Sequence, residues 1–189
     1  MERREALKAL ALLTGGAVLV PSCNFLKEDI LAAYKNLQVT PSLQQLLGTI
    51  ADTLIPAGGI KGAADLNVQD FVLVMVNDCL EPEEQQVFMQ GLQQFNAYSD
   101  STGGGDFADL AQPDREKVLL AGLAIEKKDD AADPQQAVRE FLRITKQFTI
   151  QGYMMSEYIM TQVKPYQMIP GEYQGAVLLT DIKTETIHG

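Results

Sequence analysis

An apolar stripe of helical period in the last third of the chain is the feature that most constrains its fold. Asp133 and Pro134 supply an N-cap and a first-turn proline, so we predict a helix from there to about Gln162. Its apolar positions are spaced by threes and fours, which places them on one face. They are Val138, Phe141, Thr145, Phe148, Gly152, Met155 and Ile159. No strand-like alternation of comparable strength occurs in the sequence, and we therefore expect an all-α fold.

Four shorter helices are predicted upstream from proline and capping signals. Their expected starts are Thr40–Pro41, Asn67, Pro82 and Pro113. Pro56 ends the first of them, since the residue before a proline is pushed out of helical geometry, and Leu123 ends the last. By composition alone the apolar run 71–76 also fits a buried strand, and only its cap and its polar end favour a helix. The expected architecture is a single-domain orthogonal bundle of about five helices.

Gly152 is the unusual member of the stripe, because a glycine inside a helix costs about 1 kcal/mol relative to alanine. We therefore expect another backbone to approach it closely. The apolar surface around it is wider than one neighbouring helix would cover, and two interpretations stay open. Either the helix is buried on most sides by its own domain, or Gly152, Tyr153, Met154 and Tyr158 belong to an exposed patch that docks another subunit.

Residues 1–22 have the layout of an export signal. Arg3 and Arg4 are followed by Leu7 and Lys8 at the spacing of a twin-arginine motif, and then by the uncharged stretch 9–21. That stretch is shorter than the roughly 20 residues that a membrane-spanning helix needs. A general secretory signal is the alternative. The twin-arginine route exports folded proteins, and its usual cargo holds a cofactor.

Cys23 follows this signal in the sequence Val20-Pro21-Ser22-Cys23, which resembles a lipobox. We expect signal cleavage before Cys23 and attachment of a lipid to it, with a simple cut nearby as the alternative. Residues 23–39 are then interpreted as a tether and residues 40–189 as the folded domain. The expected location is the periplasm, with the lipid as the only contact with the membrane.

Few residues of the chain could carry chemistry. The only histidine is His188, and the two cysteines, Cys23 and Cys79, cannot build a haem or zinc site. We therefore expect no catalytic, cofactor-binding or metal-binding residue, and we interpret Cys79 as a small buried hydrophobe. The net charge of −10 at pH 7 argues against nucleic-acid binding, because it repels phosphate backbones.

The sequence resembles the family of subunit 3, the small subunit, of gluconate 2-dehydrogenase and related flavin-dependent sugar dehydrogenases. The landmarks that carry the resemblance are the runs 50–56, 62–65 and 170–175 and the pairs Asp70-Phe71, Gly91-Leu92, Gly152-Tyr153 and Ser156-Glu157. The resemblance implies a cofactor-free partner of a large FAD-containing oxidoreductase of the glucose-methanol-choline type. It further implies that the complex often includes a membrane cytochrome c with haem c, and that the small subunit helps the flavoprotein to fold and to pass the twin-arginine pore.

The function expected from the sequence is therefore that of an exported, non-catalytic escort subunit of a periplasmic sugar or alcohol dehydrogenase. Two alternatives from other classes remain. One is a free-standing exported lipoprotein that binds a ligand or an envelope component. The other is an enzyme that uses carboxylates in a pattern not recognised here.

Overall fold

The computed structural model describes residues 30–128, 133–164, 175–176, 178 and 180. Its five α-helices are α2 (Pro41–Leu54), α3 (Val68–Cys79), α4 (Pro82–Gly103), α5 (Gln112–Leu123) and α6 (Pro134–Met154). Three short turns are η1 (Ala64–Leu66), η2 (Phe107–Asp109) and η3 (Ile159–Val163), of which η3 is π-helical. No strand occurs among the described residues. The prediction of an all-α fold with about five helices is confirmed.

Most of these helices begin at the capping residue or proline that the sequence predicts. The side chains of Thr40 and Asp133 accept hydrogen bonds from first-turn backbone N–H groups of α2 and α6, the second at 2.9 Å. A proline stands in the first turn of α2, α4, α5 and α6. Asn67 differs, because it lies in the left-handed region (φ 50°) and its side chain makes no capping bond to α3. Asn67 therefore stands at the predicted N-cap position and the helix begins where expected, but its side chain does not cap it.

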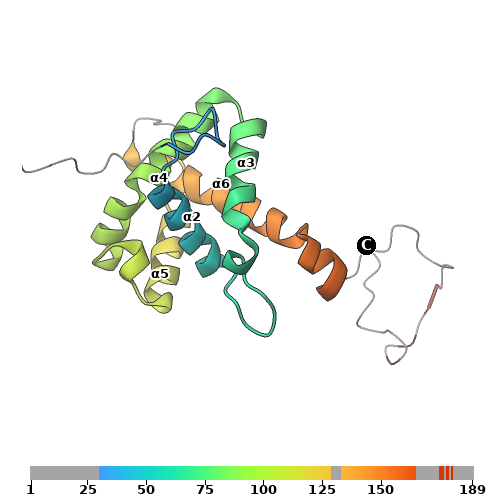
Figure 1. Ribbon diagram of the computed structural model, residues 1–189. Helices are drawn as coiled ribbons and strands as arrows, with labels where there is room; N and C mark the ends of the chain where they lie inside the picture. Colours follow the sequence, from blue (N-terminus) through green and yellow to red (C-terminus); the bar gives the residue numbers. More distant parts are fainter. Residues whose placement is uncertain (1–29, 129–132, 165–174, 177, 179, 181–189) are drawn as a thin grey trace, which may run out of the picture.

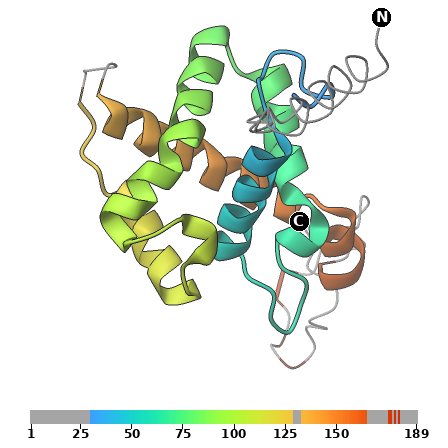
Figure 2. The same cartoon turned by 60° about the vertical axis from the view of Figure 1, so that its left-hand side comes forward.

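The most extensive contact between two helices is that of α4 with α6. Figures 1 and 2 show α6 crossing behind the other helices at a steep angle. The Phe141 ring of α6 lies 5.2 Å from the Phe88 ring and 5.6 Å from the Phe95 ring of α4, centroid to centroid. Phe107 of η2 extends this aromatic group, 5.0 Å from Phe95. Because aromatic side chains bury large apolar areas, the group stabilises the centre of the fold.

Buried side chains form two clusters. The main cluster takes residues from all five α-helices and from η2, among them Leu47, Ile50, Val72, Val76, Phe88, Leu92, Phe95, Phe107, Val118 and Phe141. The second cluster consists of Ala51, Ala63, Val68, Tyr153 and Ile159, with Ile55, Leu66, Tyr158 and Val163 packed against it. It joins the end of α2, the turn η1 and the end of α6.

The segment before α2 contributes to the main cluster. Tyr34, Leu37 and Val39 are buried, and the backbone N–H of Leu31 donates to the Val39 carbonyl oxygen at 2.8 Å. The Asn36 side chain also donates to the backbone carbonyl of Asn77 at 2.9 Å. Residues 34–39 therefore belong to the folded domain, which corrects the prediction that the tether reaches residue 39.

The last helix is shorter than predicted. α6 ends at Met154 instead of near Gln162, and Met155 takes a non-helical conformation (φ −93°, ψ 1°). The Ser156 hydroxyl donates to the Tyr153 carbonyl at 2.8 Å and accepts from the Ile159 N–H at 3.3 Å. A serine that satisfies local backbone groups in this way competes with a continuous helix. Met155, predicted on the buried stripe, is consequently 65% exposed.

Cys79 is the last residue of α3, and its thiol side chain is exposed. It stands beyond the last buried positions of that helix, Val76 and Asn77. The prediction that Cys79 is a buried hydrophobe is therefore wrong. Among the described residues, no helix has the length and apolar character required to cross a membrane.

Candidate functional site

The predicted site residues fall into two groups with different outcomes. Arg3, Arg4, Leu7, Lys8 and Cys23 lie outside the residues that the structure describes. The four candidate interface residues all lie at the end of α6 or just after it, next to the second cluster. The candidate interface is therefore located where the end of α6 meets the second cluster.

Gly152 has the close neighbour that the sequence predicts, but the neighbour is a side chain. The Phe71 ring of α3 lies directly against the Gly152 backbone. A Cβ atom built on Gly152 would lie 2.8 Å from Cγ of Phe71 and nearer still to its Cδ1. Only a glycine lets the two helices pack at this distance. The expectation of an approaching backbone is corrected to an approaching aromatic ring.

Tyr153 is an internal residue and not part of an exposed patch. It is 7% exposed, and its hydroxyl donates a hydrogen bond of 2.6 Å to the backbone carbonyl of Lys61. Burial raises the pKa of the Tyr153 phenol, with smaller contributions from Tyr158 and Asp65. The ring and hydroxyl of Tyr153 are therefore occupied within the chain, which for this residue favours the first of the two interpretations, a helix buried by its own domain.

Tyr158 is partly exposed to solvent, and Met154 is exposed. Tyr158 is half-buried against the second cluster, and the Lys61 ammonium lies 5.1 Å from the centre of its ring, a cation–π arrangement. Met154 is 42% exposed. Of the four predicted interface residues, Met154 is the only one in the exposed class.

The segment that the end of α6 packs against is the loop between α2 and η1, and the sequence does not predict this contact. The N–H of Ala63 donates to the Ile55 carbonyl at 2.9 Å, and the N–H of Gly62 donates to the Asp65 carboxylate at 2.9 Å. A Cβ on Gly62 would lie 2.8 Å from the Pro56 carbonyl carbon, so this tight closure requires glycine. The glycines Gly58 and Gly59 predict a turn here, and the run Gly62-Ala63-Ala64-Asp65 is a family landmark, but neither signal predicts that the loop packs against the end of α6.

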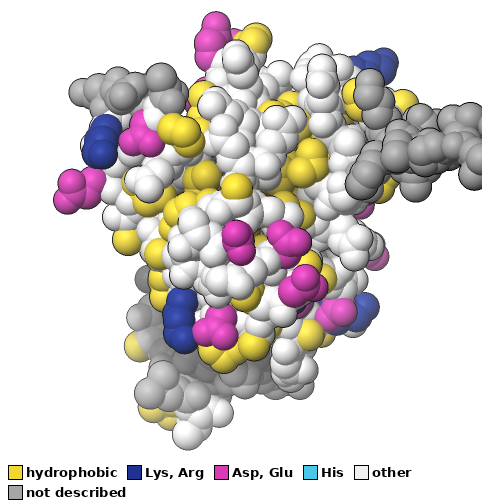
Figure 3. All heavy atoms as spheres, turned by 90° about the vertical axis from the view of Figure 1, so that its left-hand side faces the viewer, with side chains coloured by type: hydrophobic (Ala, Val, Ile, Leu, Met, Phe, Trp, Pro, Cys, Tyr) yellow, Lys and Arg dark blue, Asp and Glu magenta, His cyan; other side chains and the backbone are white. Residues whose placement is uncertain are grey.

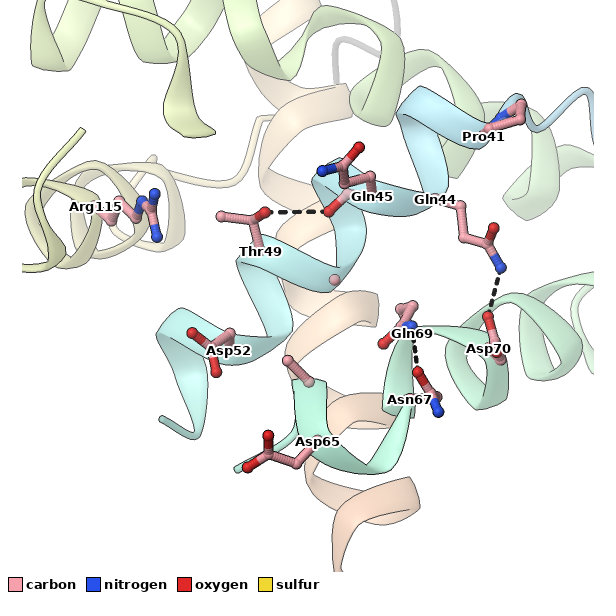
Figure 4. A pocket seen from close by; sticks show the side chains of 12 residues that line it. Pro41, Gln44, Gln45, Thr49, Asp52, Asp65, Asn67, Gln69, Asp70 and Arg115 are labelled. Carbon is pink, nitrogen blue, oxygen red and sulfur yellow. Dashed lines mark hydrogen bonds between the residues drawn. The ribbon is translucent and has the colours of Figure 1, made fainter. Parts of the chain in front are cut away.

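A polar groove of about 740 Å³ lies beside this end of the molecule and was also not predicted. Figure 4 shows that α2 forms one side, η1 and the start of α3 the other, while Arg115 of α5 stands apart at the edge. The groove is lined by Pro41, Gln44, Gln45, Gly48, Thr49, Asp52, Ala64, Asp65, Asn67, Gln69, Asp70 and Arg115.

Two pairs of polar side chains in this groove are bonded to each other, and in one of them Gln69 donates to Asn67 at 3.4 Å. Gln44 donates to the Asp70 carboxylate at 2.6 Å. Burial, followed by the neighbouring Asp70 carboxylate, raises the pKa of the Tyr34 phenol. Oε1 of Gln69 is buried without a hydrogen-bond donor. No group of three or more His, Cys, Asp or Glu side chains among the described residues could hold a metal ion.

The family model described as gluconate 2-dehydrogenase subunit 3 matches residues 41–171, which is more than half of the chain. No curated protein and no solved structure matches.

Proposed function

Because the chain belongs to the gluconate 2-dehydrogenase subunit 3 family, we propose that it is a non-catalytic accessory subunit of a sugar or alcohol dehydrogenase. The large subunit of this enzyme, a separate chain of the glucose-methanol-choline type, holds the FAD. The family match carries the proposal, since it covers all five α-helices and the second cluster. The family name itself makes the chain one subunit of a larger dehydrogenase.

The geometry at the end of α6 supports a structural role. Gly62 and Gly152 permit close packing, and the Tyr153 hydroxyl bonds to the backbone carbonyl of Lys61. These landmark residues are thus used to fix the shape of the chain itself. A fixed surface is what a subunit needs in order to bind a partner without a large ordering cost.

We extend the proposal to export. The pair Arg3 and Arg4, with Leu7 and Lys8, would direct the chain and its folded flavoprotein together through the twin-arginine pore. A lipid on Cys23 would then hold the complex at the periplasmic face of a membrane, where a cytochrome c subunit could accept its electrons.

Purification of the intact complex tests the first part of the proposal. The full chain, tagged at its C-terminus and produced in its own host, is isolated from the envelope fraction. We expect an FAD-containing protein with sugar or alcohol dehydrogenase activity to be recovered with it in a fixed ratio. Recovery of the chain alone, without flavin absorbance or dehydrogenase activity, would contradict the proposal and favour a free-standing lipoprotein.

Two variants test the export part. Changing Arg3 and Arg4 together to lysine should leave both proteins in the cytoplasm, because the paired arginines are what the twin-arginine machinery reads. Cys23→Ser is the matched control, and it should release a soluble exported complex, since the lipid fixes position and does not shape the core. Continued export of the double-lysine variant would show that the chain uses the general secretory route.

A further inference from the structure

The polar groove contains more acidic groups than its own basic residue neutralises. Asp52, Asp65 and Asp70 line it, against Arg115 at its edge. The Arg115 guanidinium donates to the backbone carbonyl of Phe107 at 3.0 Å, so it is directed toward η2. None of the ion pairs between described residues includes any of the three aspartates. The groove therefore has a negative charge that the folded domain leaves unpaired.

Hydrogen-bond acceptors are also in excess in this groove. The Asp52 carboxylate has no hydrogen-bond or ion-pair partner among the described residues. Asp65 accepts a hydrogen bond from the N–H of Gly62, although a carboxylate can accept about four. Oε1 of Gln69 is buried without a donor, which costs stability. The group that would complete this groove is therefore a cation with several N–H donors.

Two of the carboxylates lie on opposite sides of the groove. Figure 4 shows Asp52 on α2 and Asp65 on η1, both toward the same end. A guanidinium presents five N–H donors in a planar fork that matches a carboxylate. Consecutive side chains of an extended segment point in opposite directions. Two adjacent arginines in an extended segment would therefore each face one of these aspartates.

The chain itself contains such a pair. Arg3 and Arg4 are the only adjacent arginines in the sequence, and Lys8 follows on the same segment. Glu2 and Glu5 reduce the charge of residues 1–8 but leave it net positive. The segment is thus complementary in charge to the groove, and its paired arginines match the two acidic sides.

The N-terminal part of the chain enters the folded domain beside this groove. The phenol of Tyr34 borders it, since after burial the neighbours that shift the Tyr34 pKa are the groove residues Asp70 and Gln44. About 20 residues separate Lys8 from Ile30, where the described chain begins, and when extended they span up to roughly 70 Å. A domain of this size is only about 35 Å across. The segment can therefore reach the groove, and the tether raises its local concentration there.

Charge alone does not select this groove. On the face shown in Figure 3, acidic side chains are also more frequent than basic ones. A second hollow, of about 300 Å³, also lies beside the chain before α2, but Asn36, Gln38, Gln85 and the other residues that line it carry no charge. The polar groove combines an enclosed shape, unpaired carboxylates on two sides and a position next to the incoming chain.

From these observations we propose that the polar groove is an intramolecular docking site for residues 1–8, in which Arg3 and Arg4 pair with Asp52 and Asp65. While the segment is docked, its arginines are shielded from any other molecule that would read them. The uncleaved chain would thus mask the pair to which we assign export. This contact goes beyond the proposed function and does not depend on a flavoprotein.

Trypsin, which cuts after arginine and lysine, measures the shielding. The full chain is purified, its intact N-terminal segment is verified by mass, and the rate of cleavage after Arg4 is compared with that after the exposed Lys127. We expect Asp52→Asn to accelerate cleavage after Arg4 about fivefold, and roughly thirtyfold when Asp65→Asn is added, the factors for one and two salt bridges at the upper end of their range. Cleavage after Lys127 should not change.

Glu83→Gln is the matched control. It removes one exposed carboxylate from α4, outside the groove, so cleavage after Arg4 should remain at the wild-type rate. Salt should accelerate this cleavage in the wild type more than in the double aspartate variant, because it screens the pairs that the variant lacks. Melting temperatures of all variants are measured to show that each is folded.

Cross-linking tests the contact directly. Arg4→Lys introduces an ammonium that a zero-length carbodiimide joins to a carboxylate in contact with it. We expect peptide mapping to find position 4 linked to Asp52 or Asp65, and the link to be lost when both are changed to asparagine. A link to carboxylates outside the groove instead would overturn the assignment.

The remaining outcomes are equally informative. Equal cleavage after Arg4 in the wild type and the aspartate variants would show that the segment is not docked. Equal acceleration by Glu83→Gln would show a general attraction to the acidic surface and no specific site. A cleavage rate that falls with protein concentration would place the segment on another copy of the chain. Each of these results refutes the inference and leaves the proposed function untouched, because the flavoprotein takes no part in the measurements.

Discussion

Replacing Gly91 by alanine tests how tightly α4 and α6 pack. Gly91 is a buried residue of α4 at its crossing with α6. A Cβ atom at this position would lie 2.9 Å from the carbonyl carbon of Ala137 and closer still to its oxygen and to Cβ of Phe141. Carbon atoms in favourable contact are about 3.5–4.0 Å apart. These neighbours belong to or adjoin the α6 backbone, so no side-chain rotation can make room, and the two helices must separate.

The expected magnitude follows from two opposing effects. Overpacking of a core costs roughly 1–3 kcal/mol of unfolding free energy, and a rigid obstacle places this case at the upper end. Alanine in place of glycine inside a helix returns up to about 1 kcal/mol. The net loss is therefore about 2 kcal/mol for Gly91→Ala. For a chain of this length that loss lowers the melting temperature by roughly 4–8 °C.

Gly48→Ala is the matched control within the same protein. Gly48 lies inside α2, and its added Cβ would be 3.6 Å from Cδ of Gln69, an ordinary contact. This variant should be stabilised by up to about 1 kcal/mol, since it gains helix propensity without overpacking. Both are measured by thermal and urea unfolding, followed by circular dichroism. A Gly91→Ala variant that melts at or above the wild-type temperature would refute the packing argument.

Three other variants test single interactions. Tyr153→Phe removes a hydrogen bond to a loop carbonyl, so the unfolding free energy should fall by about 1 kcal/mol in urea titrations. Thr145→Val should raise the melting temperature, because the buried Thr145 hydroxyl has no hydrogen-bond partner, whereas Thr53→Val should lower it, since that hydroxyl donates to a backbone carbonyl. The hydrogen bond from Arg143 lowers the pKa of Glu140, so this pair stabilises the fold above the unfolded pKa of about 4.3 and the effect is lost on further acidification. Arg143→Gln should then cost less than about 1 kcal/mol at neutral pH and nothing in strong acid, measured by urea unfolding at both pH values.

The sequence predicts where helices begin better than where they end. Starts at Pro41, Pro82 and Pro134 follow from local chemistry, since proline and a capping side chain act within one turn. The end of α6 depends on Ser156, whose hydroxyl bonds on both sides of the break. A serine in an apolar repeat does not predict the end of a helix, because the same residue is also tolerated inside one.

The surroundings of the α6 end could not be predicted for a different reason. Periodicity identified Gly152 as a position of close packing, and the structure supplies the neighbour, Phe71. For Tyr153 the pattern indicates an apolar face but not which segment covers it. The covering loop contributes the carbonyl of Lys61, which lies 92 residues earlier in the chain. Only the tertiary structure brings such distant segments together, and the same holds for the groove between α2 and α3.

The division of the buried side chains into a large and a small cluster implies that the native chain does not open as one unit. Few apolar groups hold the end of α6 against η1, so this end can open at a lower free energy than the α4–α6 centre. Its backbone amides should then exchange hydrogen with solvent as a group, together with those of the loop that the Tyr153 hydroxyl holds. A partner bound at this end would slow that exchange while leaving the centre unchanged. Assembly would therefore be recorded as local protection, without any change in the overall shape of the chain.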